Sequence, residues 1–191
     1  MVLFRSIAVA ASALAGLVSA LPAEIAARQT YTPGTLNNTR EFYISMTVTD
    51  GPTTYNGWQL EAYHTGAGLA DPVFVAGAGS RAYLNGTSLQ FDVSPYAFGA
   101  EAFASDTNYA RWEPVSISSG YGSQNFVNQG PAGLQVDSEE HDGWIVCEWF
   151  HDRNAPQLFQ LIAGFDTVGG LDPYTDIPAT CARVLLFPQW I

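Results

Sequence analysis

The chain has 191 residues, of which 13% are charged, and its formal net charge is −11 because 18 acidic side chains outnumber seven basic ones, all of them Arg. This length suits one domain with a sizeable core rather than several domains. The shortage of positive charge excludes a phosphate-binding footprint for nucleic acid, and we interpret the acidity as a source of solubility, with a cation or a cationic partner as the less favoured alternative.

The first 20 residues have the pattern of a cleavable secretory signal peptide. Arg5 precedes an unbroken run of small and apolar residues over 7–18, and Val18-Ser19-Ala20 resembles a cleavage site. The apolar run is shorter than the roughly 20 residues that span a bilayer, so we expect a secreted, extracellular protein without membrane insertion. Residues 21–39 are interpreted as a possible pro-segment and flexible N-terminal arm, which leaves the mature N-terminus open between cleavage after Ala20 and after Arg28.

Residues 40–191 are predicted to form one all-β domain, because alternation of period two dominates and long helical periodicity is missing. The first strand has an apolar face made of Phe42, Ile44, Met46 and Val48. A second strand is expected over 58–64, and a third apolar run covers 73–76.

The pair Asn85-Gly86 is the strongest hairpin signal in the chain, since a two-residue type I′ turn requires positive φ at both positions. It predicts two strands in which one face carries Ala82, Leu84, Leu89 and Phe91, while Ser88, Gln90 and Asp92 lie outside. Residues 94–133 are rich in Gly, Ser, Asn, Pro and aromatic residues and are predicted to form loops with short strands.

The last third of the chain predicts a second hairpin and a central strand. Residues 144–150 and 157–162 are strand-like runs joined by a short connector, and residues 183–187 are apolar on both faces, as is typical of a central strand. The resulting total of about seven or eight strands predicts a single-domain antiparallel β-sandwich or a barrel-like sandwich.

The two cysteines and two sequons are features that an exported protein can use. Cys147 and Cys181 are an even pair in an oxidising compartment and predict one disulfide, which would tether the start of the 183–187 strand to the 144–150 strand. Asn37 and Asn85 each begin an Asn-x-Thr sequon and are predicted N-glycosylation sites.

Most catalytic and cofactor signatures are missing, so we expect no cofactor and no metal site. There is no G-x-S-x-G elbow, and the glycines at 77 and 79 precede a turn rather than the helix of a dinucleotide site. Asp142 occupies the position at which a calcium loop beginning at Asp137 would need Gly. His64 is interpreted as a core or rim residue rather than a catalytic base.

Two pairs of residues are weak candidates for a functional site. Glu61 and Glu148 are strand carboxylates beside aromatic residues, and two acids about 5 to 10 Å apart would suit glycoside hydrolysis. Trp112 and Tyr121 lie in the polar loop region and are candidates for ligand contact at the surface, whereas Trp58, Trp144 and Trp149 are interpreted as packing residues.

Four stretches of the sequence carry a resemblance to a known group of proteins: Leu60–Gly68, Tyr83–Thr87, Thr107–Pro114 and Gly143–Trp149. Together they resemble an uncharacterised family of small secreted fungal proteins. The resemblance covers most of the chain after Arg40 and implies a single extracellular β-rich domain from filamentous fungi. It implies no activity and no site residues.

The sequence therefore favours a secreted acidic glycoprotein that acts as a non-catalytic binding module for a carbohydrate, a small ligand or an extracellular protein. One alternative is a polysaccharide-acting glycoside hydrolase that uses Glu61 and Glu148. The other is a secreted factor directed at a host or a competitor.

Overall fold

The structure is a computed structural model that describes residues 36, 39–93, 95–102, 111–149, 155–163 and 179–191. The predicted signal peptide over 1–20, nearly all of the predicted arm over 21–39, and the sequon residue Asn37 lie outside the described residues. The described strands belong to one compact unit within Tyr31–Ile191.

The described residues form an all-β fold, as predicted, with thirteen strands rather than seven or eight. These are β1 (Phe42–Asp50), β2 (Gln59–Gly66), β3 (Leu69–Val75), β4 (Ala82–Asn85), β5 (Ser88–Phe91), β6 (Phe98–Glu101), β7 (Trp112–Pro114), β8 (Ser116–Ser119), β9 (Phe126–Asn128), β10 (Leu134–Val136), β11 (His141–Glu148), β12 (Pro156–Ile162) and β13 (Ala182–Trp190). Two 3-10 turns are η1 (Thr53–Tyr55) and η2 (Gly130–Ala132). The count was underestimated because strands of three or four residues are too short to show a clear alternation.

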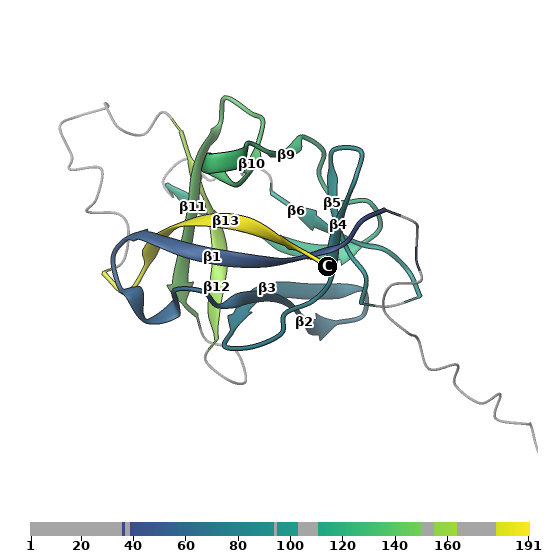
Figure 1. The fold of residues 1–191 in the computed structure, drawn as a ribbon, viewed down its shortest axis with the longest axis horizontal. Coiled ribbons are helices and arrows are strands. Elements are labelled where there is room, and N and C mark those ends of the chain that lie inside the picture. The colour runs from purple at the N-terminus through teal and green to yellow at the C-terminus, as the bar shows by residue number, and fades with distance from the viewer. Residues whose placement is uncertain (1–35, 37–38, 94, 103–110, 150–154, 164–178) are drawn as a thin grey trace, which may run out of the picture. The chain divides into compact units, whose positions relative to one another are not determined.

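Eleven strands form one antiparallel sheet in the order β2-β3-β8-β6-β5-β4-β1-β13-β11-β12-β7, and β9 and β10 pair separately. Two additional pairings, β2 with β1 and β3 with β12, join strands that are distant in this order. The sheet therefore curls back on itself into a ring, which agrees with the predicted barrel-like sandwich. Figure 1 shows β1 beside β13, which pair in register from Phe42 opposite Trp190 to Val48 opposite Val184.

The inside of the ring is the main hydrophobic core. The predicted apolar face of β1 is confirmed, because Phe42, Ile44 and Met46 are buried and Val48 packs against the same cluster. Trp144 of β11 is also buried here, and its indole Nε1–H donates a hydrogen bond of 2.7 Å to the carbonyl of Leu134. Burial of these large side chains stabilises the fold by about 1.5 to 3 kcal/mol each.

The β4–β5 hairpin is confirmed, but its turn is displaced by one residue. Asn85 pairs with Ser88, so the two-residue loop is Gly86-Thr87 rather than Asn85-Gly86. Gly86 has φ of 63°, which satisfies the need for positive φ at the first loop position of a type II′ turn. Asn85 ends its strand and its side-chain amide donates to Gln90 Oε1 at 3.0 Å.

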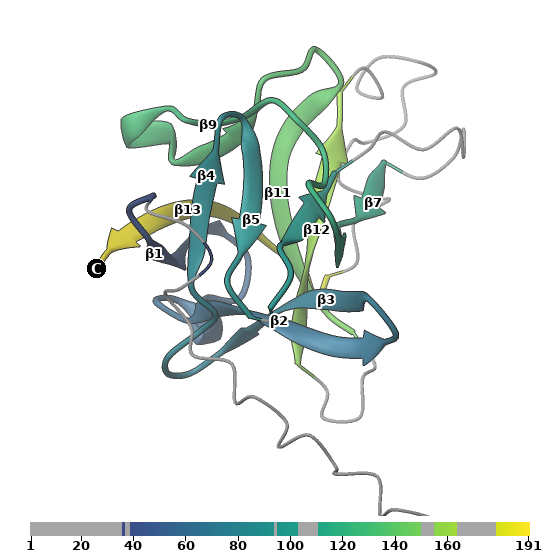
Figure 2. The same ribbon diagram turned by 90° about the vertical axis from the view of Figure 1, so that its right-hand side faces the viewer.

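The second face of β5 is buried, contrary to the prediction that Ser88, Gln90 and Asp92 lie outside. The segment that follows β8 covers this face: Gln90 donates a hydrogen bond to the carbonyl of Gly120. Later in the same segment, the backbone amide of Phe126 donates a hydrogen bond to the carbonyl of Thr87. Figure 2 shows β9 near the turn end of β4 and β5. Such coverage by a distant loop leaves no local pattern in the sequence of β5.

The second predicted hairpin and the disulfide are both confirmed. β11 pairs with β12 from Trp144 opposite Gln160 to Glu148 opposite Pro156, and β13 lies between β1 and β11. Cys147 and Cys181 form a disulfide with a Cα–Cα distance of 4.1 Å. Both cysteines belong to a second, smaller apolar cluster with Ile145, Phe159 and Leu161, outside the main core.

Candidate functional site

Glu61 and Glu148, the predicted carboxylate pair, lie on opposite faces of the sheet. Glu61 is opposite Val73, Val73 is opposite Gln157, and Gln157 is opposite Cys147. Direct cross-strand partners share a face, so Glu61 lies on the face of Cys147, whereas Glu148 follows Cys147 along β11 and lies on the other. Three strand spacings, roughly 14 Å along the sheet, separate β2 from β11. The structure does not bring the two carboxylates into one cleft.

Glu148 has a structural partner in Tyr55, the last residue of η1. The Tyr55 hydroxyl donates a hydrogen bond to Glu148 Oε1. Burial, followed by this hydrogen bond and the charge of Glu148, raises the pKa of Tyr55 to about 12, because a phenolate beside a carboxylate would be repelled. This contact ties the end of β11 to η1.

Trp112, a predicted ligand residue, is half-buried and packs in an aromatic cluster. Its ring centroid lies 5.0 Å from that of Phe159 and 6.1 Å from that of Trp149, in both cases edge to face. Rings this close leave no room for a ligand between them. Trp149, interpreted from the sequence as a packing residue, makes these contacts but keeps 46% of its surface exposed.

Tyr121, the other predicted ligand residue, is 71% exposed and is held on a tightly fixed backbone. It lies between Gly120 and Gly122, whose φ values are 124° and 71°. A Cβ on Gly99 would lie 2.2 Å from the backbone of Tyr121 and Gly122, so this segment can pass over β6 only because Gly99 has no side chain. Tyr121 is thus displayed to solvent from a rigid turn, and the structure does not bring it together with Trp112 in any described cavity.

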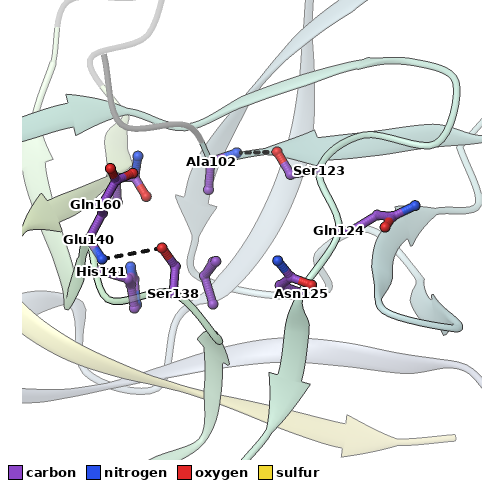
Figure 3. Close-up of a pocket in the computed structure, with 9 residues that line it drawn as sticks. Ala102, Ser123, Gln124, Asn125, Ser138, Glu140, His141 and Gln160 are labelled. Carbon is purple, nitrogen blue, oxygen red and sulfur yellow. Dashed lines mark hydrogen bonds between the residues drawn. The ribbon is translucent and has the colours of Figure 1, made fainter. Parts of the chain in front are cut away.

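The chain continues from Tyr121 into the wall of a polar cavity of about 220 Å³, shown in Figure 3. Its lining comes from the end of β6, the segment before β9, the β10–β11 connection and β12. The lining residues are Ala102, Ser123, Gln124, Asn125, Val136, Ser138, Glu140, His141 and Gln160. Glu140 is the only acidic residue among them, and the other polar groups are hydroxyls, amides and one imidazole.

Two backbone hydrogen bonds and two side-chain bonds hold the cavity walls. The Ser123 amide donates to the carbonyl of Ala100, and the Ala102 amide donates to Ser123 Oγ at 3.0 Å. Across the cavity, the Glu140 amide donates to Ser138 Oγ at 3.2 Å. Asn125 has φ of 72°, a left-handed conformation that Asn tolerates better than most residues, and its carbonyl accepts a hydrogen bond from the Asp137 amide. Figure 3 shows Asn125 across the cavity from Ser138.

His141 is held as a neutral imidazole by its surroundings. The Gln135 side-chain amide donates to the carbonyl of Ala132 at 2.7 Å, which fixes Gln135 Oε1 as the acceptor for His141 Nε2 at 3.1 Å. Nε2 therefore carries the proton. Burial, partly against the Trp144 ring at 4.4 Å, lowers the pKa of His141 to about 4, against the smaller opposing effects of Gln160 and the charge of Asp142. The imidazole adds no charge to the cavity at neutral pH.

No motif in the sequence predicted this cavity. The sequence around His141 resembles a calcium loop that lacks the required Gly. In the part of the chain that the structure describes, no three side chains of His, Cys, Asp or Glu gather as metal ligands. His64, predicted as a core or rim residue, is exposed near the end of β2. Asn85 and Thr87 of the second sequon are exposed. No helix among the described residues is long and apolar enough to cross a bilayer.

A family model described as a domain of unknown function, DUF7907, matches residues 39–190. The chain belongs to the DUF7907 family. The match spans every strand from β1 to β13, so the ring of strands and the cavity residues all lie inside the DUF7907 domain. No curated protein and no solved structure has a significant match to the chain.

Proposed function

We propose that this DUF7907 protein is a secreted, non-catalytic binding module that holds a small uncharged polyhydroxyl ligand, a carbohydrate unit, in the cavity beside His141. The observation that carries the proposal is the lining of that cavity, in which every hydrogen-bonding side chain except Glu140 is neutral. Amides, hydroxyls and a neutral imidazole can donate to and accept from the hydroxyl groups of a sugar without the cost of leaving a charge unpaired.

The size and charge of the cavity support a small neutral ligand over a large or anionic one. A cavity of about 220 Å³ lies below the range of roughly 300 to 1,000 Å³ that is typical of drug-sized ligands. Glu140 at the cavity and the net charge of −11 would repel anions. The small side chains of Ala102 and Val136 offer apolar contact to the C–H groups of a sugar ring.

Secretion, fungal origin and glycosylation are part of the same proposal. The disulfide is consistent with an oxidising compartment, and the signal-like residues 1–20 supply the route of export. The exposed Asn85 at the start of the hairpin loop suits glycan attachment. The fungal source rests on the sequence resemblance alone.

A calorimetric titration with a panel of neutral monosaccharides and disaccharides tests the proposal. We expect saturable binding without product release, and we expect Asn125→Gly to weaken it at least fivefold. Glycine adopts the φ of Asn125 without strain, so this variant removes only the side chain. Gln189→Ala, which removes an exposed amide from β13, is the matched control and should bind as the wild type does. Released product that depends on Glu61 or Glu148 would instead support the hydrolase alternative.

A further inference from the structure

Three strand ends bring three exposed apolar side chains to one part of the surface. Ser119 of β8 donates its backbone amide to the carbonyl of Gly68, just before β3, and Gly120 donates to the carbonyl of Ala97, just before β6. These bonds align the starts of β3 and β6 with the end of β8. The exposed side chains beside them are Leu69, Tyr96 and Tyr121, which are 50%, 73% and 71% exposed. We refer to these three residues as the tyrosine surface.

The segments that carry the tyrosine surface contain no charged residue. Residues 65–69, 95–97 and 118–125 lack Asp, Glu, Lys and Arg entirely, although the whole chain has 18 acidic residues and a net charge of −11. They are made mainly of Gly, Ser, Tyr, Ala and amide residues. Tyr offers a large, rigid ring at a low cost in conformational entropy, and Ser, Gly and Asn supply adaptable hydrogen bonds. This composition is typical of adaptable recognition surfaces such as antibody paratopes.

The tyrosine surface and the cavity beside His141 share one short segment of the chain. Tyr121 is two residues before Ser123, which lines the cavity, so their Cα atoms are at most about 7 Å apart. The backbone between them is fixed, because a Cβ on Gly122 would lie 2.3 Å from the carbonyl oxygen of Ala100. The backbone of Tyr121 is therefore fixed within about 7 Å of the cavity wall.

We propose that the tyrosine surface extends the cavity into a binding path for a neutral polysaccharide chain. One sugar unit occupies the cavity, and following units lie over the rings of Tyr121 and Tyr96, whose faces stack on the C–H faces of pyranose rings. The absence of positive charge from these segments, together with the carboxylate of Glu101 on the Gly99 face of β6, disfavours an anionic chain. This inference rests on the proposed carbohydrate function of the cavity, and it adds the class of ligand and the direction in which the chain continues.

The test compares short and long ligands on the full secreted protein. The probes are glucose, mannose and N-acetylglucosamine, together with the hexasaccharides of β-glucan, mannan and chitin, titrated by calorimetry. For the sugar that binds, we expect Tyr121→Ala and Tyr96→Ala each to weaken hexasaccharide binding roughly three- to tenfold and to leave monosaccharide binding unchanged. Tyr121→Phe keeps the ring and should keep the affinity. Ile191→Ala removes a side chain that is 53% exposed at the end of the chain and should change neither.

The outcomes separate the two proposals. If the hexasaccharide binds the Tyr→Ala variants as tightly as the wild type, the extension is wrong while the cavity proposal stands. If no monosaccharide or hexasaccharide binds at all, both are wrong. A uronate hexasaccharide that binds more tightly than the neutral one would contradict the selection against charge, and capture of a protein by these tyrosines without any glycan binding would overturn the assignment of a polysaccharide.

Discussion

Protonation of His141 should destabilise the fold in acid. The group has a pKa of about 4 in the folded protein and 6.5 as its ordinary value. The folded state therefore binds fewer protons than the unfolded chain between these two pH values, and stability falls as the pH drops through that window. Above pH 6.5 both states are neutral and the contribution to stability is fully present.

The size of this effect follows from the pKa difference. The full shift corresponds to about 3 kcal/mol as an upper bound at pH 4. The ring is only partly buried, so solvent screening reduces the expected loss to about 2 kcal/mol between pH 7.5 and pH 4.5. His141→Asn keeps a hydrogen-bonding side chain of similar reach but has no group that titrates in this window.

Urea denaturation of the wild type and of His141→Asn at both pH values measures the effect. The many carboxyl groups titrate in both proteins, so the difference between the two pH dependences isolates the imidazole. We expect the wild type to lose about 2 kcal/mol more than the variant. Equal losses in the two proteins would refute the account of His141 as a buried neutral group.

Three further predictions concern the fold and its modification. Replacement of both Cys147 and Cys181 by Ser should lower the free energy of unfolding by about 3 to 4 kcal/mol, as expected for a closed loop of 34 residues; a loss below about 1 kcal/mol in urea denaturation would contradict this. Gly99→Ala should cost about 3 kcal/mol or prevent folding, because its Cβ would meet backbone atoms at 2.2 Å that cannot move aside; a melting temperature equal to that of the wild type would show that the close approach is not real. Asn85 should carry an N-glycan when the protein is secreted from a eukaryotic host, and mass spectrometry that finds only the bare peptide would reject the site.

The long strands of the fold were predictable because each buries one face in the core. The apolar positions of β1 and the apolar run of β13 predicted both strands correctly. The two cysteines were paired correctly because the chain has no others. The buried second face of β5 was not predictable. It is covered by residues 120–126, some 30 positions later in the chain, and a pattern within β5 carries no record of that contact.

The candidate site was harder to predict than the fold, because it depends on how the sheet curls and on which distant strands become neighbours. Glu61 and Glu148 look equivalent in the sequence, and only the register across β2, β3, β12 and β11 separates their faces. His141 and Asn125 both line the cavity. They are brought there because residues 120–125 pass over β6 and the chain then returns through β10, where the Asp137 amide donates to the carbonyl of Asn125. The exposure of Tyr121 agrees with its predicted place in a polar loop region, whereas Trp112, predicted on the same ground, is half-buried. Ligand contact by Tyr121 stays a prediction.

The most direct test of the central claim is an NMR titration of the ¹⁵N-labelled protein with the neutral sugar that binds best. We expect saturable shifts of the His141 imidazole and of the backbone amides of Ser123, Asn125 and Ser138, with little change at Trp112. Shifts confined to the Trp112 and Trp149 cluster, or none up to millimolar sugar, would contradict the assignment of the cavity as the binding site.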